Sequence, residues 1–297
     1  MGTLSVPPLG EVESKLKQAW VQLRYEQPPL VITVEGSTKV YNVLDGGDLQ
    51  AWLAETFVVS SAADADELYR TLGSIVQATM YYLPQASQLV LHVYHYVIDA
   101  IEVLMLWDRY LRAFASCSKR PNIRVSIEPA FLAPSFADLL GGHCSPSREQ
   151  AEEIIATWME YANKAAPRGL VQVSNAKHMP AGQCRSTRII FPAQATTASI
   201  QVCKARDISV TSAVHVAFIL TFLKVADPNL QSTHYMTSLN FDLRPCLPKP
   251  YTTSRYAASV YYTPLPFNME PLDSFLETAR IINQSYRTTF RDDSQFV

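Results

Sequence analysis

The feature that most constrains the fold is the passage from an apolar strand to an amphipathic helix within residues 88–116. Residues 88–97 form an apolar run that is typical of a strand, and residues 101–116 repeat apolar side chains at the helical spacing of three and four. His95 and Asp99 lie at the junction. We predict that His95 lies where the strand ends and that Asp99 starts the helix. The predicted apolar stripe of that helix is Leu104, Trp107, Leu111 and Phe114.

Helices and strands are predicted along the whole chain, without strict alternation. The predicted helices are 12–23, 48–57, 65–72, 148–165, 193–206, 213–226 and 272–286. The predicted strands are 30–34, 39–43, 78–83, 122–127, 185–192, 235–244 and 259–263. This mixture favours an α/β fold of two layers with mixed sheets over a doubly wound parallel sheet. The irregular stretch 167–195 predicts a division into domains 1–180 and 181–297.

Composition excludes several classes of function. The 297 residues include 25 Lys and Arg and 27 Asp and Glu, so the chain lacks the basic excess that nucleic-acid binding requires. Residues 1–20 lack the apolar segment of a secretory signal, and the apolar run 213–223 is too short to span a bilayer. The five cysteines are widely spaced, which predicts free thiols in a reducing compartment. We expect a cytoplasmic monomer whose partners include neither nucleic acid nor a membrane.

The functional interpretation depends on His95. The chain contains no G-x-G-x-x-G, G-x-x-x-x-G-K-[ST], H-E-x-x-H or G-x-S-x-G motif. If strand alternation continues, His95 ends an apolar face and is a core residue with satisfied ring nitrogens. Alternatively, His95 is a general base, because an imidazole can take a proton from a hydroxyl near neutral pH. Asp99, taken alone, is a helix N-cap.

Residues 94–100, YHYVIDA, resemble the H-H-x-x-x-D-G motif of CoA-dependent acyltransferases and of peptide-synthetase condensation domains. Residues 16–29, LKQAWVQLRYEQPP, are similar to the first long helix of that superfamily. Residues 239–251, LNFDLRPCLPKPY, resemble the strand that begins the core of its second domain. Their Arg-Pro-x-Leu-Pro sequence is most similar to fungal alcohol O-acetyltransferases, such as the trichothecene 15-O-acetyltransferases of mycotoxin clusters. The resemblance covers residues 10–290 and implies a chloramphenicol acetyltransferase-like α/β fold.

The resemblance also implies a reaction and three site residues. His95 matches the catalytic histidine, and Asp99 matches an aspartate that pairs with an arginine of the other domain, for which Arg244 is the candidate. The resemblance implies a reaction that moves an acyl group, acetyl in the fungal O-acetyltransferases, from acyl-CoA to the hydroxyl of a secondary metabolite such as a terpenoid. His95 Nε2 takes the hydroxyl proton in a tunnel between the domains. Acetyl-CoA is then a co-substrate, with no permanently bound cofactor and no metal.

This chain departs from the family pattern in two residues and in length. Tyr94 replaces the first histidine, a mainly structural position. Ala100 replaces the glycine, and its methyl group is expected to crowd the catalytic loop. Family members extend further at both ends, so we expect an incomplete second domain. Two other functions therefore stay open. One is ester or amide formation from carrier-bound thioesters, as in condensation domains, and the other is a truncated, inactive relative.

Three other residues are weaker candidates. His215 lies in an apolar helix and is expected to be a core residue. Tyr261 and Tyr262 either line a substrate tunnel or fill a strand face, and packing is the favoured interpretation. The oxyanion-stabilising group is not assigned by the sequence.

Overall fold

The structure is a computed structural model, and it describes residues 9–36, 38–43, 47–116, 132–139, 147–164, 187–225, 235–270 and 274–292. The chain forms two compact units. Unit 1 consists of Met1–Gly142, Gln183–Arg185 and Asp242–Tyr262, and unit 2 consists of His143–Gly182, Ser186–Phe241 and Thr263–Val297. The predicted domain boundary between residues 180 and 181 lies outside the described residues and stays a prediction.

Unit 1 contains a three-stranded mixed sheet. The strands are β3 (Phe57–Val59), β4 (Thr79–Leu83) and β5 (Gln88–His92), in that spatial order. β3 and β4 are parallel, whereas β4 and β5 are antiparallel. The mixed sheet, together with its covering helices, confirms the predicted α/β class.

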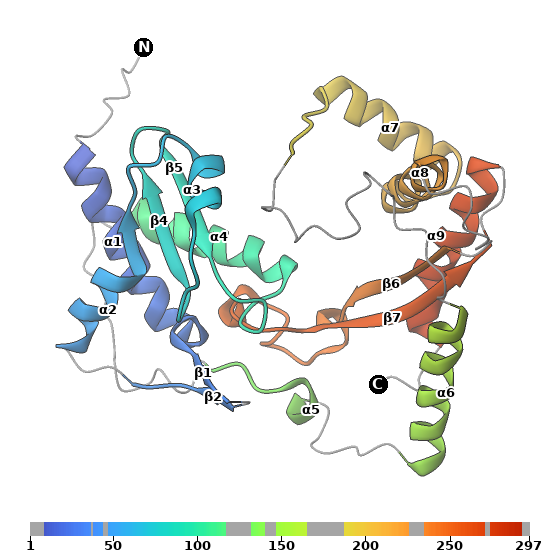
Figure 1. Cartoon of the computed structure of the whole chain (residues 1–297), viewed down its shortest axis with the longest axis horizontal. Coiled ribbons are helices and arrows are strands. Elements are labelled where there is room, and N and C mark those ends of the chain that lie inside the picture. Colours follow the sequence, from blue (N-terminus) through green and yellow to red (C-terminus); the bar gives the residue numbers. More distant parts are fainter. Residues whose placement is uncertain are drawn as a thin grey trace, which may run out of the picture. The chain divides into compact units, whose positions relative to one another are not determined.

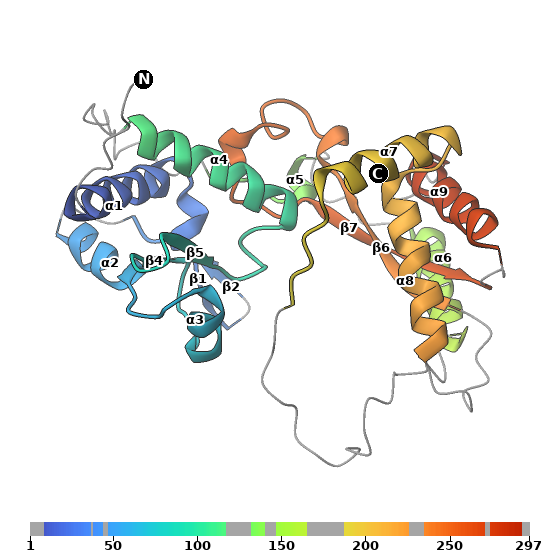
Figure 2. The ribbon, with the colours of Figure 1, turned by 90° about the horizontal axis from the view of Figure 1, so that it is seen from above.

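Four helices of unit 1 surround this sheet. The helices α1 (Leu9–Glu26) and α4 (Ala100–Ser116) pack against each other and cover one face of the sheet (Figures 1 and 2). The helix α2 (Asp48–Thr56) contacts β3 and β4, and α3 (Ala65–Thr71) contacts β5. All four were predicted to within a few residues.

The core of unit 1 lies between α1, α4 and the sheet. α1 buries a stripe of Leu16, Ala19, Trp20 and Leu23, each at most 3% exposed. The Trp20 ring stacks on Trp52 of α2, and its indole N–H donates to the Thr56 hydroxyl. Burying such a large aromatic face contributes about 1.5–3 kcal/mol, so this stripe fixes α1 on the sheet.

The buried stripe of α4 differs from the predicted one. Leu104 is 68% exposed and Leu111 is 51% exposed, so the prediction for these two was wrong. The buried residues of α4 are Glu102, Leu106, Tyr110 and Ala113. The hydroxyl of Tyr110 donates to the Leu16 carbonyl on α1, so the side of α4 that carries Tyr110 faces α1.

The strand before α4 is shorter than predicted. β5 ends at His92, and residues 93–99 form a loop with a turn at residues 95–97. Strand alternation therefore does not reach His95. The predicted strands 30–34 and 39–43 correspond to β1 (Thr33–Glu35) and β2 (Thr38–Val40), which pair antiparallel, but Leu30 and Val31 belong to the 3-10 helix Pro28–Val31 where a strand was expected.

Unit 2 combines four helices with a strand pair. The strands β6 (Tyr235–Asp242) and β7 (Tyr262–Met269) pair with each other. The last residue of β6, Asp242, and the first residue of β7, Tyr262, belong to unit 1. α8 (Val210–Val225) and α9 (Phe275–Asp292) lie side by side, with α7 (Ala193–Ala205) against α8 (Figure 1). The core of unit 2 is Cys203, Ile208, Val216, Ile219, Met269, Ala279 and Ile282.

Three further predictions concern a helix and two strands. α6 (Arg148–Lys164), predicted at 148–165, begins with a capping box, in which the Ser147 and Gln150 side chains each accept a hydrogen bond from the other's backbone N–H. The strand predicted at 185–192 is wrong for its described part, because residues 187–192 form no strand. The strand predicted at 122–127 lies outside the described residues.

His215 is half-buried in unit 2 and is less buried than the predicted core position. Its Nε2 lies 3.0 Å from the Tyr235 hydroxyl, and its Nδ1 lies 3.3 Å from the Tyr286 hydroxyl. The Phe267 ring lies beside it. Burial lowers the pKa of His215, so the neutral imidazole is the form that this aromatic site stabilises.

We predict that His215 makes the stability of unit 2 depend on pH. Its folded pKa lies below the unfolded value of 6.5, so its contribution is complete above pH 6.5 and is lost as the pH falls. His215→Phe should cost about 1 kcal/mol per hydrogen bond lost at pH 8, and less at pH 5.5. Urea unfolding at both pH values measures this. An equal cost at both would contradict the prediction.

No single helix in the described part of the chain combines the length and apolar character needed to cross a bilayer. α7 and α8 satisfy those criteria only when taken together, and their axes are bent by 100° at the break between them.

Candidate active site

His95 lies at the tip of a turn whose other residues are anchored. The Val97 N–H donates to the Tyr94 carbonyl across 3.0 Å, which closes the turn. The Tyr94 hydroxyl donates to the Ile75 carbonyl, and its ring stacks on Tyr96 with centroids 5.0 Å apart. Val97 and Ile98 are buried in the core of unit 1. The residues that flank His95 are therefore held by unit 1, and Tyr94 has the structural role expected of its position.

The His95 side chain itself is exposed. The interpretation of His95 as a buried core histidine was therefore wrong, because the strand ends three residues before it. Its ring lies 5.6 Å from the Tyr262 ring, with an angle of 35° between the planes. An exposed imidazole on a fixed turn can reach a proton of a bound molecule, so the general-base interpretation stays a prediction.

Asp99 caps α4. Its Oδ1 accepts hydrogen bonds from the backbone N–H groups of Ile101 and Glu102, at 3.0 and 3.2 Å. The Glu102 carboxyl reaches back to the Asp99 N–H at 3.4 Å, as in a capping box. The predicted cap is confirmed, and the N-terminus of α4 holds the end of the His95 turn in place.

Asp99 also forms an ion pair with Arg244. The Arg244 Nη2 lies 2.8 Å from the Asp99 Oδ2, and both side chains are 5% exposed. Arg244 begins a 3-10 helix, Arg244–Cys246, and the same guanidinium pairs with Glu102 and with Asp242. Although 145 residues separate the two partners, both belong to unit 1. The roles of His95, Asp99 and Arg244 in a reaction stay predictions.

Glu102 is the site residue that the sequence did not reveal. It is fully buried and contacts the Arg244 guanidinium and both the hydroxyl and the N–H of Ser259. Burial raises the pKa of Glu102 to about 7, although bonds from Ser259 and Arg244 act in the opposite direction. For Arg244, burial lowers the pKa, but its carboxylate partners outweigh burial and raise it. The cation is permanent, whereas Glu102 titrates near neutral pH.

We predict that Glu102 makes unit 1 less stable as the pH rises. Its folded pKa of about 7 exceeds the unfolded value of 4.5, so the contribution is complete below pH 4.5 and is lost as the pH rises through 7. The wild type minus Glu102→Gln difference in melting temperature should fall by about 2 °C or more between pH 5.5 and 8. Thermal unfolding followed by circular dichroism measures it. A difference that is independent of pH would contradict the prediction.

The segment 254–262 is tied to α1 and α4 by polar side chains. The Gln27 amide donates to the Ser254 and Arg255 carbonyls and accepts from the Ala258 N–H, at 2.9–3.2 Å. Further along, the Tyr261 N–H donates to the Asp99 Oδ2 at 3.1 Å. Segment 254–262 therefore arrives beside the His95 turn with Tyr262 at its end.

The remaining sequence candidates are placed as follows. Tyr261 is 2% exposed and donates its hydroxyl to the Pro134 carbonyl, which confirms packing for this residue. Tyr262 is half-buried and faces His95. Ala100 is exposed, so the expected crowding by its methyl group was wrong.

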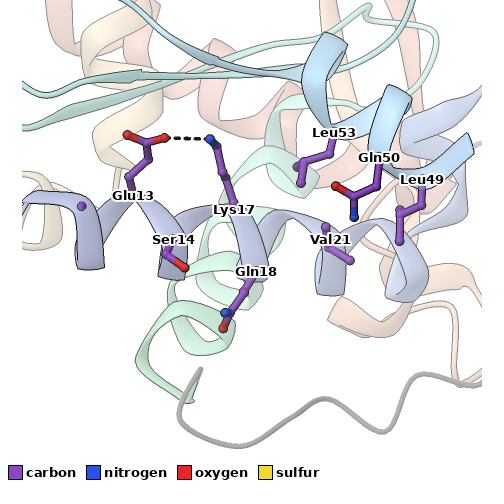
Figure 3. Close-up of a pocket in the computed structure, with 9 residues that line it drawn as sticks. Glu13, Ser14, Lys17, Gln18, Val21, Leu49, Gln50 and Leu53 are labelled. Atoms are coloured by element: carbon purple, nitrogen blue, oxygen red, sulfur yellow. Dashed lines mark hydrogen bonds and ion pairs between the residues drawn. The ribbon is translucent and has the colours of Figure 1, made fainter. Parts of the chain in front are cut away.

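A hollow in unit 1 lies away from His95. It has a volume of about 450 Å³ and lies between α1 and α2, over Val21, Leu49 and Leu53 (Figure 3). Its charged residues, Glu13 and Lys17, pair with each other at 2.7 Å. None of the three predicted site residues lines it, so we do not assign chemistry to it. Among the described residues, no three His, Cys, Asp or Glu side chains are grouped so that they could hold a metal ion.

The sequence is similar to those of fungal acetyltransferases. No protein-family model matches the chain. The sequence is 29% identical over 279 residues to acetyltransferase pigO and 26% identical over 275 residues to O-acetyltransferase pigM, both of Monascus ruber. Each alignment covers 92% of the chain but only 60% and 54% of the respective relative. The chain therefore spans little more than half the length of these curated relatives.

Solved structures with the same arrangement include acyltransferases and condensation domains. TRI3 trichothecene 15-O-acetyltransferase from Fusarium sporotrichioides superimposes with a TM-score of 0.75 at 15% identity, over 100% of this chain and 67% of that one. The first condensation domain of the calcium-dependent antibiotic synthetase superimposes with a TM-score of 0.55 at 13% identity, over 92% and 65% of the two chains. The chain therefore shares the fold of this O-acetyltransferase and of this condensation domain, as its sequence predicted.

Proposed function

We propose that this chain carries the catalytic histidine of an acyl-CoA-dependent O-acyltransferase, which moves an acetyl group from acetyl-CoA to the hydroxyl of a secondary metabolite. The observation that carries the proposal is the exposed imidazole of His95 on a turn held from behind by Asp99 and Arg244. The similarity to acetyltransferase pigO and O-acetyltransferase pigM supports the acetyl group. The higher TM-score with an O-acetyltransferase than with a condensation domain favours an alcohol as acceptor.

The reaction needs one proton carrier. His95 accepts the proton of the alcohol as its oxygen attacks the thioester carbonyl, so that the C–O bond forms. When the tetrahedral intermediate collapses, the C–S bond breaks and the imidazolium returns the proton to the departing thiolate. Asp99 does not touch His95 in this scheme. Its ion pair and its cap keep the turn in place, so the imidazole need not reorganise during the reaction.

The experiment offers the chain acetyl-CoA with a panel of alcohols. The panel includes azaphilones and trichothecenes, because those words stand in the names of an aligned relative and a structural neighbour. We expect an acetyl ester by mass spectrometry and one equivalent of free CoA, with slow CoA release when the alcohol is omitted. A folded protein that forms no ester with any alcohol would refute the proposal.

We further propose that the protein acts as a cytoplasmic monomer. Among the described cysteines, Cys203 and Cys246 are free thiols, which supports a reducing compartment. Light scattering after size-exclusion chromatography should give a mass near 33.2 kDa. A mass of twice this value would contradict the monomer.

A further inference from the structure

The carboxyl group of Glu102 lies between the His95 turn and segment 254–262. On one side it accepts from the Asp99 N–H, at the base of the turn. On the other side it contacts the hydroxyl and the N–H of Ser259, three residues before Tyr262. We propose that Glu102 is a positioning residue for His95, acting through Ser259 and the Tyr262 ring. This inference rests on the proposed function and assigns that site a further residue.

The contacts form one continuous path from Glu102 to His95. Ser259 is 6% exposed, and the Tyr261 N–H that follows it donates to Asp99. The Tyr261 carbonyl accepts from the Leu243 N–H at 2.9 Å, so the backbone on both sides of Tyr261 is fixed. Tyr262 follows directly, with its ring beside the imidazole of His95. Ser259 is thus the contact through which Glu102 reaches this segment, and Tyr262 carries the one described ring that contacts His95.

The donors and acceptors around Ser259 are matched best when the Glu102 carboxyl group is protonated. The Ser259 hydroxyl has one proton but contacts two acceptors, Glu102 Oε1 and the Tyr256 carbonyl, the latter at 2.9 Å. If Glu102 is protonated, it donates to Ser259 Oγ, and Ser259 donates to Tyr256. Both contacts are then satisfied. An ionised Glu102 competes with Tyr256 for the same proton.

The charges around Glu102 agree with a neutral carboxyl group. Asp99 and Asp242 already pair with the Arg244 guanidinium. Burial raises the pKa of the Tyr261 hydroxyl, which stays neutral and adds no charge to the cluster. One cation with two anionic partners leaves no unbalanced positive charge for a third carboxylate, and burying an extra charge is costly.

The experiment compares two substitutions of Glu102 with a matched control in the same helix. Asp108→Ala is the control, because Asp108 is an exposed acid that pairs with Arg112 at the next turn of α4. The first readout is the NMR chemical shift of the His95 ring protons, which are assigned by their loss in His95→Ala. The ring current of Tyr262 should displace this chemical shift from that of free histidine. The second readout is kcat and KM for acetyl transfer.

In Glu102→Ala we expect the His95 signal to move toward that of free histidine and kcat to fall about 10-fold or more, while KM for acetyl-CoA changes less than kcat. Glu102→Gln retains a donor to Ser259 and should leave the signal near its wild-type position. Asp108→Ala should change neither readout. A folded Glu102→Ala protein with an unmoved His95 signal would overturn the inference.

If Glu102→Ala does not fold, Ser259→Ala takes its place, since it removes only the hydroxyl in the path. The His95 signal should move in the same direction, and an unmoved signal again overturns the inference. The NMR readout needs no turnover. A wild type that transfers no acetyl group would therefore refute the proposed function, while the His95 signal still decides the role of Glu102.

Discussion

Replacing His95 with alanine should abolish most acetyl transfer while leaving the protein folded. A positioned general base contributes about 10²- to 10⁴-fold to a rate, so kcat should fall by that factor. His95 is exposed and, in the described structure, its one recorded contact is the ring of Tyr262. Its loss should therefore lower the free energy of unfolding by no more than about 0.5 kcal/mol. Steady-state kinetics and urea unfolding measure the two effects.

A second histidine provides the control. His92 ends β5, three residues before His95, and it contributes no contact to the Asp99 and Arg244 cluster. His92→Gln should retain kcat per folded molecule. Undiminished transfer by His95→Ala would remove His95 from the reaction. An equal loss in both variants would assign the effect to the end of the strand rather than to the imidazole.

The sequence predicted the local part of the site well. The change from a strand pattern to a helix pattern placed Asp99 at an N-cap, and the structure has it there. The end of β5 was predicted too late because residues 93–98 remain apolar. In the structure Val97 and Ile98 are buried in the core of unit 1, and the Tyr94 hydroxyl donates to the Ile75 carbonyl. These side chains are therefore packed without forming a strand.

The partners of Glu102 could not be predicted from local pattern. The predicted stripe of α4 was rotated relative to the observed one, which placed this glutamate on the polar side of the helix. A charged residue is seldom buried unless it is paired, and its partners Ser259 and Arg244 come from a distant segment. The one local signal was the D-x-x-E spacing of a capping box at residues 99–102.

Arg244 entered through the resemblance alone, because no periodicity points to it. Gln27 lies directly after α1, and its amide holds a backbone segment 227 to 231 residues away, which no local pattern predicts. Such long-range pairs depend on the assembled fold. A single sequence therefore predicts the elements and the turn, and the structure is needed to identify the cluster beneath it.

The second large effect concerns the stability of unit 1. Arg244→Ala and Asp99→Ala should each lower its free energy of unfolding by about 3–5 kcal/mol, since each removes one member of a buried ion pair and leaves the charge of the other less compensated. That is a large part of the 5–15 kcal/mol typical of a domain. Asp242→Asn is the matched control. Asp242 pairs with the same guanidinium but is 35% exposed, so its loss should cost at most about 1 kcal/mol.

Conservative replacements sharpen this test. In Asp99→Asn, an amide oxygen can still cap α4, but the amide nitrogen then faces two other donors, Arg244 Nη2 and the Tyr261 N–H. Arg244→Lys keeps the charge but cannot reach three carboxylates at once, because an ammonium lacks the planar fork of a guanidinium. Neither replacement should restore stability in urea unfolding. If either did, or if Asp242→Asn cost as much as Asp99→Ala, the buried ion pair would not be what fixes the His95 turn.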